Sequence, residues 1–115
     1  MLFRSTDLAD IRAVSAFDVS ERDSPWSRTP GGRFGAHQYR EKLDSTLIYA
    51  TWFSGGLRIV DVADPLLPVE VAHYIPEPVG DQPAPATNDV DVDARGLIYL
   101  LDRDRGFDIV EYTGA

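Results

Sequence analysis

The 115-residue sequence contains no cysteine, so disulfides, thiolate zinc sites and cysteine nucleophiles are excluded for this chain. Basic side chains are also few. Eleven Lys and Arg stand against 19 Asp and Glu, which gives a formal net charge of −8 at pH 7. A protein this acidic offers no basic surface that would follow a phosphate backbone. Nucleic acid is therefore not expected as a partner.

Long apolar runs are absent as well. The longest, residues 47–53, is far too short to cross a membrane, so no membrane partner is expected. Residues 1–7 lack the apolar core of a secretory signal, which favours a cytoplasmic location. The chain also has no G-x-S-x-G elbow, no P-loop and no G-x-G-x-x-G motif.

The most informative feature that is present is an internal repeat. The tripeptide Leu-Ile-Tyr at 47–49 recurs at 97–99, and the segment 56–61 (GLRIVD) recurs at the same offset as 106–111 (GFDIVE). A weaker echo relates Asp-Val-Ala-Asp at 61–64 to Asp-Leu-Ala-Asp at 7–10. The chain therefore holds two copies of one structural unit.

The unit is predicted to consist of strands, because short runs of Val, Ile, Tyr and Phe alternate with Gly, Pro, Asp and Ser clusters. Residues 5–17 also fit a helix by spacing, but the repeat match favours a strand there. Long loops are expected at 20–33 and 76–87, and tight turns at 54–56 and 104–106. The predicted strands are 12–19, 34–41, 46–53, 56–62, 69–75, 88–93, 97–102 and 106–112.

Strands 57–62 and 97–101 are apolar on both faces, a pattern typical of sheets covered on both sides. Four-stranded blades stacked around an axis, as in a β-propeller, bury both faces in this way. With strands lettered a to d from axis to rim, residues 34–75 make one full blade and 88–113 supply strands a, b and c of a second. Residues 11–19 supply a lone rim strand d. The whole chain, 1–115, is thus predicted to be one all-β unit of about eight strands in the order d-abcd-abc.

The lone rim strand is separated from the incomplete blade by a whole blade. It is therefore expected to complete the blade of a neighbouring chain, which removes exposed edges from both partners. Head-to-tail repetition of that contact closes a ring. The predicted partner is the chain itself, as a cyclic homo-oligomer in which a trimer of six blades is favoured over a tetramer of eight.

The segment 56–65, GLRIVDVADP, followed by Pro-Val-Glu-Val at 68–71, resembles the LVIVD repeat of bacterial β-propeller proteins. The segments 33–38 and 88–93 are similar to inner-strand segments of such proteins, and full-length members are several times longer. The resemblance implies that this chain corresponds to the C-terminal two blades of a longer propeller. It implies a fold rather than an activity.

His37 is the first candidate site residue, because it falls in a predicted inner strand and the repeat places Asn88 at the equivalent position. Inner strands line the channel of a propeller, so a ring of three chains would present three copies of His37, which suits zinc. Glu41 lies four residues on and is a candidate base or orienting group. The alternative is that His37 only hydrogen-bonds a neighbouring blade.

Asp89 is the second candidate, because its carboxylate next to Asn88 could hold calcium at the channel mouth. The spacing of Asp89, Asp91 and Asp93 does not continue as an EF-hand loop, and alternation with Val90 and Val92 predicts an ordinary strand. Trp26, in the loop 20–33, is a candidate for ligand contact at the mouth.

Two functions are compatible with these residues. The first is a binding or scaffold module whose polar central channel holds a small molecule or a metal ion. The second is a metal-dependent hydrolase acting on an ester, lactone or phosphotriester. In the second, His37, Asn88 and Asp89 would hold zinc or calcium and Glu41 would act as base.

Overall fold

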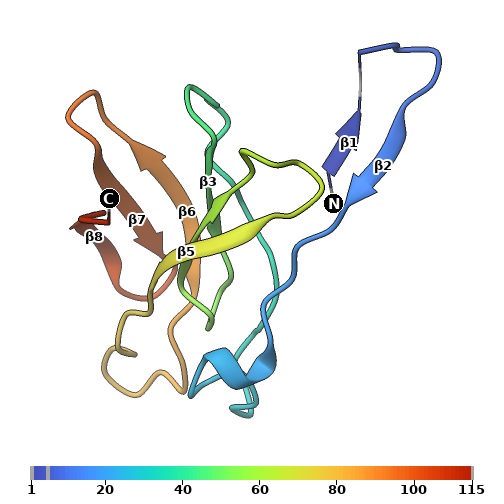
Figure 1. Ribbon diagram of the computed structural model, residues 1–115. Helices are drawn as coiled ribbons and strands as arrows, with labels where there is room; N and C mark the ends of the chain where they lie inside the picture. Colours follow the sequence, from blue (N-terminus) through green and yellow to red (C-terminus); the bar gives the residue numbers. More distant parts are fainter. Residues whose placement is uncertain (1, 5, 115) are drawn as a thin grey trace.

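A computed structural model describes residues 2–4 and 6–114, and the strands of this part form three small antiparallel sheets (Figure 1). The all-β class predicted from the sequence is confirmed. One turn of 3-10 helix, η1 (Glu21–Asp23), interrupts the first long loop, and none of the described residues belongs to a helix able to cross a membrane. The strands are β1 (Leu2–Arg4), β2 (Arg12–Ser15), β3 (Leu47–Thr51), β4 (Leu57–Asp61), β5 (Val69–Tyr74), β6 (Thr87–Val92), β7 (Leu97–Asp102) and β8 (Gly106–Glu111).

The sequence repeat corresponds to a repeated strand pairing. Strands β3, β4 and β5 form one sheet in chain order, and β6, β7 and β8 form another. Leu47 pairs with Asp61 between β3 and β4, and fifty residues later Leu97 pairs with Glu111 between β7 and β8. Because one face of each strand must be buried, equal apolar patterns lead to equal register.

The turn between β3 and β4 forms where the Ser-Gly-Gly sequence predicts it. Gly55 N–H donates to the Trp52 carbonyl at 2.8 Å, and Gly56 adopts φ +72°. A Cβ on Gly56 would lie 2.2 Å from the carbonyl oxygen of Tyr74. Glycine is therefore required at position 56 both by the left-handed backbone and by the close approach of the chain after β5.

The hydrophobic core lies between the two three-stranded sheets. Leu57 and Ile59 of β4 pack with Val90 of β6 and with Ile98 and Leu100 of β7, and each is at most 5% exposed. Complete burial of one such side chain stabilises the fold by about 1.5–3 kcal/mol. The inward Val90 and the outward Asp89 agree with the alternation predicted for this strand.

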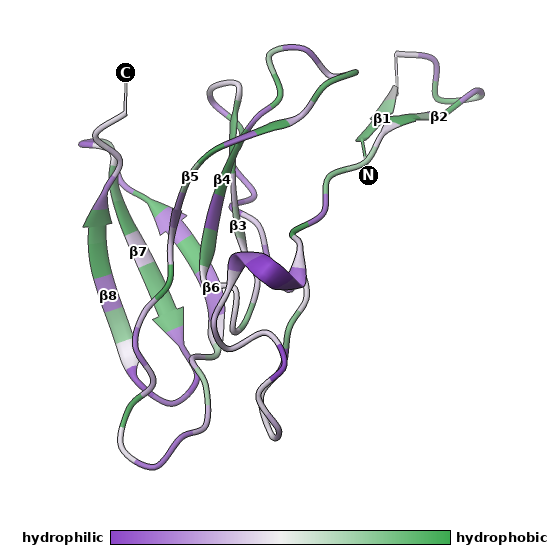
Figure 2. Ribbon diagram, turned by 60° about the horizontal axis from the view of Figure 1, so that its bottom comes forward, coloured by the Kyte–Doolittle hydropathy of each residue, from purple (hydrophilic) through white to green (hydrophobic). Residues whose placement is uncertain are grey.

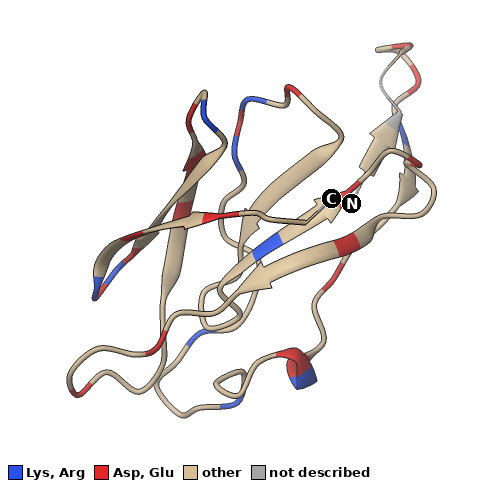
Figure 3. Ribbon diagram, turned by 60° about the vertical axis from the view of Figure 1, so that its left-hand side comes forward, with Lys and Arg blue, Asp and Glu red and all other residues tan. Residues whose placement is uncertain are grey.

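Arg58 is the exception to the apolar character predicted for both faces of β4. Its side chain is fully buried, and its Nε donates to the Gly55 carbonyl at 2.9 Å. One terminal nitrogen contacts Glu70 of β5 at 3.1 Å and the other donates to the Asp23 carbonyl at 3.0 Å. The guanidinium therefore joins β4, β5 and η1, whereas many of the other charged positions lie in loops and turns (Figure 3).

The outer face of the last sheet is open to solvent. Phe107 and Ile109 of β8 are 62% and 52% exposed, and Leu101 of β7, which pairs with Phe107, is 48% exposed. Figure 2 shows the hydrophobic character of β7 and β8. The equivalent strand of the first sheet, β4, is covered at its outer edge by β5, whereas β8 ends its sheet.

The N-terminal strand differs from the prediction. Residues 12–19 were expected to form one unpaired rim strand, but only Arg12–Ser15 is a strand, and β2 pairs with β1, which the sequence analysis missed. Residues 16–19 leave the hairpin, because the Phe17 ring packs edge-on against Trp52 with centroids 6.0 Å apart and Val19 is buried. The hairpin lies on the opposite side of the molecule from β8 (Figure 1).

The predicted inner strand 34–41 is also not a regular strand. The segment runs beside β3 through isolated bridges, one between Phe34 and Phe53 and one between Tyr39 and Ala50. The Thr51 hydroxyl accepts from the backbone N–H of Gln38 at 3.1 Å, so a side chain replaces part of the backbone ladder. The position predicted for this segment is therefore correct, but its regularity is wrong.

Candidate functional site

Thr51, at the end of β3, brings the predicted inner segments of the two units together. Its hydroxyl is fully buried and donates to the Asn88 carbonyl of β6 at 2.9 Å. Two residues after Thr51, Phe53 exchanges two backbone hydrogen bonds with Thr87, at 3.1 and 3.2 Å. The segment 34–40 and strand β6 are therefore held against the same end of β3.

His37 lies against this junction. Its Nδ1 is 2.6 Å from the Asn88 carbonyl oxygen, and its ring contacts the Phe53 ring with centroids 4.7 Å apart. A carbonyl oxygen has no proton, so Nδ1 must carry the hydrogen and donate it. The neutral imidazole then has its lone pair on Nε2, on a side chain exposed to solvent.

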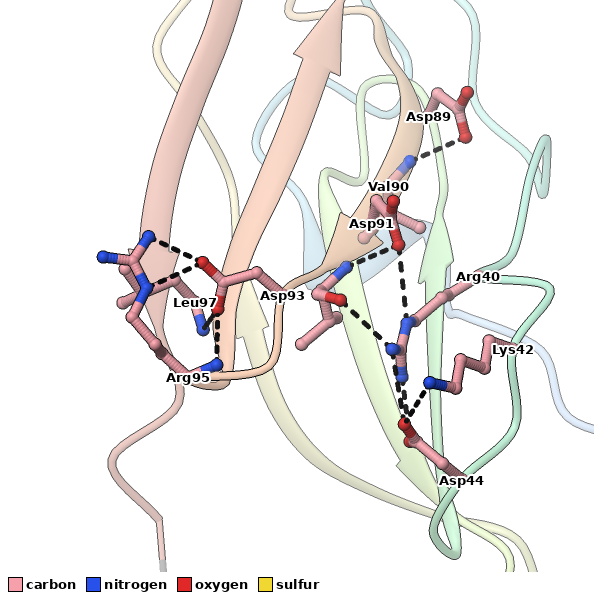
Figure 4. Close-up of polar contacts among 10 residues, drawn as sticks. Arg40, Lys42, Asp44, Asp89, Val90, Asp91, Asp93, Arg95 and Leu97 are labelled. Carbon is pink, nitrogen blue, oxygen red and sulfur yellow. Dashed lines mark hydrogen bonds and ion pairs between the residues drawn. The ribbon is translucent and has the colours of Figure 1, made fainter.

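Asn88 and Asp89 are the two predicted site residues on β6. Asn88 meets His37 through its backbone carbonyl rather than its amide. The exposed Asp89 carboxylate accepts from the Val90 backbone N–H at 2.8 Å (Figure 4). The repeat predicted only that His37 and Asn88 occupy equivalent positions in the two units. The structure brings the His37 ring into contact with the Asn88 carbonyl, which is the kind of contact that the alternative interpretation of His37 expected, and places Asp89 next along the strand.

Glu41 does not have the predicted relation to His37. In the described part of the chain no hydrogen bond or ion pair joins the two, and the group that orients the imidazole is the Asn88 carbonyl. Glu41 is exposed and lines a shallow pocket of about 410 Å³ together with Asp89 and Asp91. Glu41 thus shares a pocket with two acidic residues and with Lys42, and no contact among the described residues links it to His37.

Arg40, which the sequence analysis did not single out, is the most connected side chain near this site. It is 8% exposed, and it contacts Asp44 at 2.9 Å, the Val92 carbonyl at 3.1 Å and Asp91 at 3.5 Å (Figure 4). The hydrogen bond with Asp44 raises the pKa of Arg40 and lowers that of Asp44. Arg40 therefore ties the segment before β3 to the end of β6.

Asp93 organises the turn from β6 to β7. Its carboxylate accepts from the Arg95 side chain at 2.7 Å and from the backbone N–H groups of Arg95 and Leu97 (Figure 4). It also accepts from the Tyr99 hydroxyl at 3.0 Å. The hydrogen bond from Arg95, followed by that from Tyr99, lowers the pKa of Asp93 to about 2. Asp93 is thus committed to the turn and is not available as a cation ligand.

Trp26 is half-buried in the loop after η1. Its backbone N–H donates to the Ser24 hydroxyl at 3.2 Å, and the buried Ser24 hydroxyl in turn donates to the Ser54 carbonyl at 2.6 Å. Within residues 2–4 and 6–114, no hydrogen bond connects Trp26 with His37, Asn88 or Asp89. Its predicted contact with a ligand remains a prediction.

The two long loops meet within one chain. Residues 31–33 of the first and 82–86 of the second line one pocket, which residues 103 and 104 complete. This pocket contains none of the predicted site residues.

The described residues of one copy do not form a complete metal site. Among residues 2–4 and 6–114, no three His, Asp or Glu side chains come together in a metal-binding group. The predicted zinc or calcium site would therefore have to draw His37 and Asp89 from several chains.

Comparison of the chain with protein-family models, curated proteins and solved structures finds no match. The resemblance to the LVIVD-repeat propellers accordingly remains a prediction from the residues at 56–71.

Proposed function

We propose that this chain is a self-assembling binding or scaffold module, in which copies join head to tail into a propeller-like ring of three or four chains. The observation that carries the proposal is the open sheet β6-β7-β8, which ends at β8 and exposes Phe107 and Ile109. The channel of such a ring would hold a small molecule, and the cytoplasm is the location expected for it.

The last strand of the first sheet, β5, indicates what would cover β8. In that sheet β5 pairs with β4, with Ile59 opposite Ala72. The repeat relates Ile59 to Ile109. The apolar stretch 69–75, which follows the segment 61–64, corresponds to the stretch 13–19, which follows the segment 7–10, and this relates Ala72 to Ala16. The residue predicted opposite Ile109 is therefore Ala16 of a second copy.

The position of the N-terminal hairpin favours a second copy over the same chain. β2 pairs with β1 on one edge only, and its hairpin lies across the molecule from β8 (Figure 1). A donor strand and an acceptor edge on opposite sides make a heterologous contact, which forms a ring when the rotation between successive copies closes on itself and a filament when it does not.

Disulfide trapping tests this pairing, because the chain contains no cysteine. The double variant Ala16→Cys/Ile109→Cys is expected to form intermolecular disulfides under mild oxidation, since opposed residues in antiparallel strands lie at disulfide distance. A closed ring runs as a covalent trimer or tetramer on a non-reducing gel.

The matched control is Ala16→Cys/Val79→Cys, which puts the second cysteine in the loop before β6, where Val79 is 39% exposed. Crosslinking of the first variant with little crosslinking of the second supports the predicted register. Equal crosslinking of both, or none of the first in a folded protein, contradicts it.

A second candidate function, metal-dependent hydrolysis of an ester, lactone or phosphotriester, is favoured by the hydrogen bond of His37. Histidine ligands commonly donate one ring N–H to a carbonyl and bind the metal through the other nitrogen. The hydrogen bond from His37 Nδ1 to the Asn88 carbonyl leaves the lone pair of Nε2 free to bind a metal ion. In a ring, several copies of Nε2 and of Asp89 would supply the ligands, and Glu41 would be the candidate base.

Metal content after purification without added metal tests this second function. Stoichiometric zinc or calcium that is lost in His37→Ala supports it. A metal-free protein whose stability is unchanged by chelators contradicts it and leaves the assembly proposal untouched.

A further inference from the structure

We propose that the pocket between residues 31–33 and 82–86 binds a small organic carboxylate through Arg33 and Arg103. This inference goes beyond the assembly proposed above, because the pocket is formed within one chain. It has a volume of about 260 Å³, which suits a small ligand.

The pocket is made by close contact between two loops distant in sequence. A Cβ on Gly32 would lie 3.0 Å from the Ala84 Cβ, and one on Gly31 would lie 3.4 Å from the Pro83 ring. Ala84 is buried, at 5% exposed. The glycines thus allow the first loop to lie directly on the second and form a defined wall.

The backbones of both arginines are held at this wall. The Arg33 carbonyl accepts from the backbone N–H of Ser54 at 2.9 Å, and the Arg103 N–H donates to the Ala86 carbonyl at 3.1 Å. The Arg33 guanidinium carbon lies 5.8 Å from the centre of the Phe53 ring, within the range of a cation–π contact. The backbone hydrogen bonds therefore fix the positions from which the two arginine side chains extend at the pocket rim.

These two arginines differ from most others in the chain. Six arginines each lie within 4.0 Å of a carboxylate: Arg12, Arg28, Arg40, Arg58, Arg95 and Arg105. Arg33 and Arg103 contact no carboxylate of the described residues, although acidic residues outnumber basic ones by 19 to 11. Two arginines without a carboxylate partner among the described residues therefore line one pocket, and such a pair suits an anion.

The remaining lining indicates which anion. Guanidinium forks bind carboxylates and phosphates alike. Asp104 also lines the pocket, and its negative charge disfavours a doubly charged phosphate more than a singly charged carboxylate. Prolines and alanines at 83–86 provide an apolar wall for the body of the ligand. A carboxylate with a small apolar body, such as benzoate, fits this lining best.

Titration with sodium benzoate at constant ionic strength, followed by amide NMR of the full chain, tests the proposal. Shifts are expected at Gly31, Gly32 and Arg103. Arg33→Gln and Arg103→Gln should each weaken benzoate binding at least tenfold, while retaining the spectrum of the folded protein.

The matched control is Arg22→Gln, which removes the same charge from η1, outside the pocket. Unchanged benzoate binding in this control supports the assignment. Equal weakening by Arg22→Gln, no shifts with benzoate, or tighter binding of inorganic phosphate would each overturn it. A monomeric protein that binds benzoate would refute the ring but not this pocket.

Discussion

At the scale of single residues, two buried arginines hold together parts of the chain that are distant in sequence. Arg58 joins β4 to β5 and η1, and Arg40 joins the segment before β3 to the end of β6. Both arginines are buried, and the guanidinium group of each has carboxylate and carbonyl partners. Breaking such a network leaves buried polar groups without partners, which costs more than the loss of an exposed ion pair.

Replacing Arg58 by Met is therefore expected to destabilise the protein by about 3 kcal/mol, because the variant leaves Glu70 and two carbonyl oxygens unpaired. The measurement is the free energy of unfolding from urea denaturation. Arg12→Met breaks the exposed pair with Asp10 and should change stability little. Equal losses in the two variants would show that the Arg58 network has no special role.

A pH effect is expected at Asp93, whose pKa is lowered from 3.8 to about 2 by the hydrogen bonds of Arg95 and Tyr99. A carboxyl group whose pKa is lower in the folded state than in the unfolded state stabilises the folded state, and the stabilisation is complete at pH values above the unfolded pKa. This stabilisation is lost as the pH falls from 3.8 towards 2. The Asp93→Asn variant should therefore lose less stability over that interval than the parent. NMR titration of the Asp93 carboxyl checks the pKa directly, and a midpoint near 3.8 would contradict the expectation.

The sequence identified two positions of the candidate site but not the contact between them, and it missed Arg40. The repeat gave His37 and Asn88 equivalent positions in the two units, whereas the structure joins them directly through the His37 ring and the Asn88 carbonyl. Arg40 could not be identified in this way, because its partner carbonyl at Val92 is 52 residues away and the contact depends on how the two sheets pack. Glu41 was misjudged because the irregular path of 34–40 does not preserve the strict alternation of a strand.

At the scale of elements, the turns that close the repeated hairpins are not equivalent. Gly56 and Gly106 occupy the same repeat position and both have positive φ, +72° and +98°. A Cβ on Gly56 would collide with the Tyr74 carbonyl, whereas a Cβ on Gly106 would meet nothing within 4 Å. The first turn is packed under β5, and the second is open.

Gly106→Ala should therefore cost about 1 kcal/mol, from the left-handed backbone alone. Gly56→Ala should cost several times more, because the chain after β5 must move away. Thermal and urea denaturation of both variants measure the difference. Similar losses of stability in the two variants would mean that the backbone after β5 moves aside at little energetic cost.

The strands whose sequences belong to the repeat could be predicted from the sequence, whereas the strands outside the repeat were harder to predict. β3, β4, β7 and β8 each carry a dense run of Ile, Val, Leu or Tyr, and each lies within its predicted range. β1 has three residues and exists only through pairing with β2. Such a strand has no pattern of its own from which to predict it.

At the scale of the whole molecule, the main feature is the difference in exposure between the two three-stranded sheets. The apolar face of β7 and β8 and the outer edge of β8 are exposed, whereas the equivalent parts of the first sheet are covered. Exposed edges and apolar patches favour association, so the unit is expected to be more stable as an assembly than alone.

The Ile109→Glu variant should separate assembly from folding. Ile109 is 52% exposed in one chain, so the substitution should leave the secondary structure of the single chain intact. It should nevertheless break the ring, because the new carboxylate would be buried against a partner. Circular dichroism and sedimentation velocity, measured on the same sample, check the two effects. An assembly that survives the substitution would place the interface elsewhere.

The solution mass of the unmodified protein, measured by light scattering on a sizing column, tests assembly most directly. One chain has a mass of 12.8 kDa, and the proposed ring requires three or four times that value. A trimer or tetramer that is stable on dilution supports strand completion between copies. A folded, monodisperse monomer at 12.8 kDa would contradict it, and it would also exclude the shared channel that the proposed metal site requires.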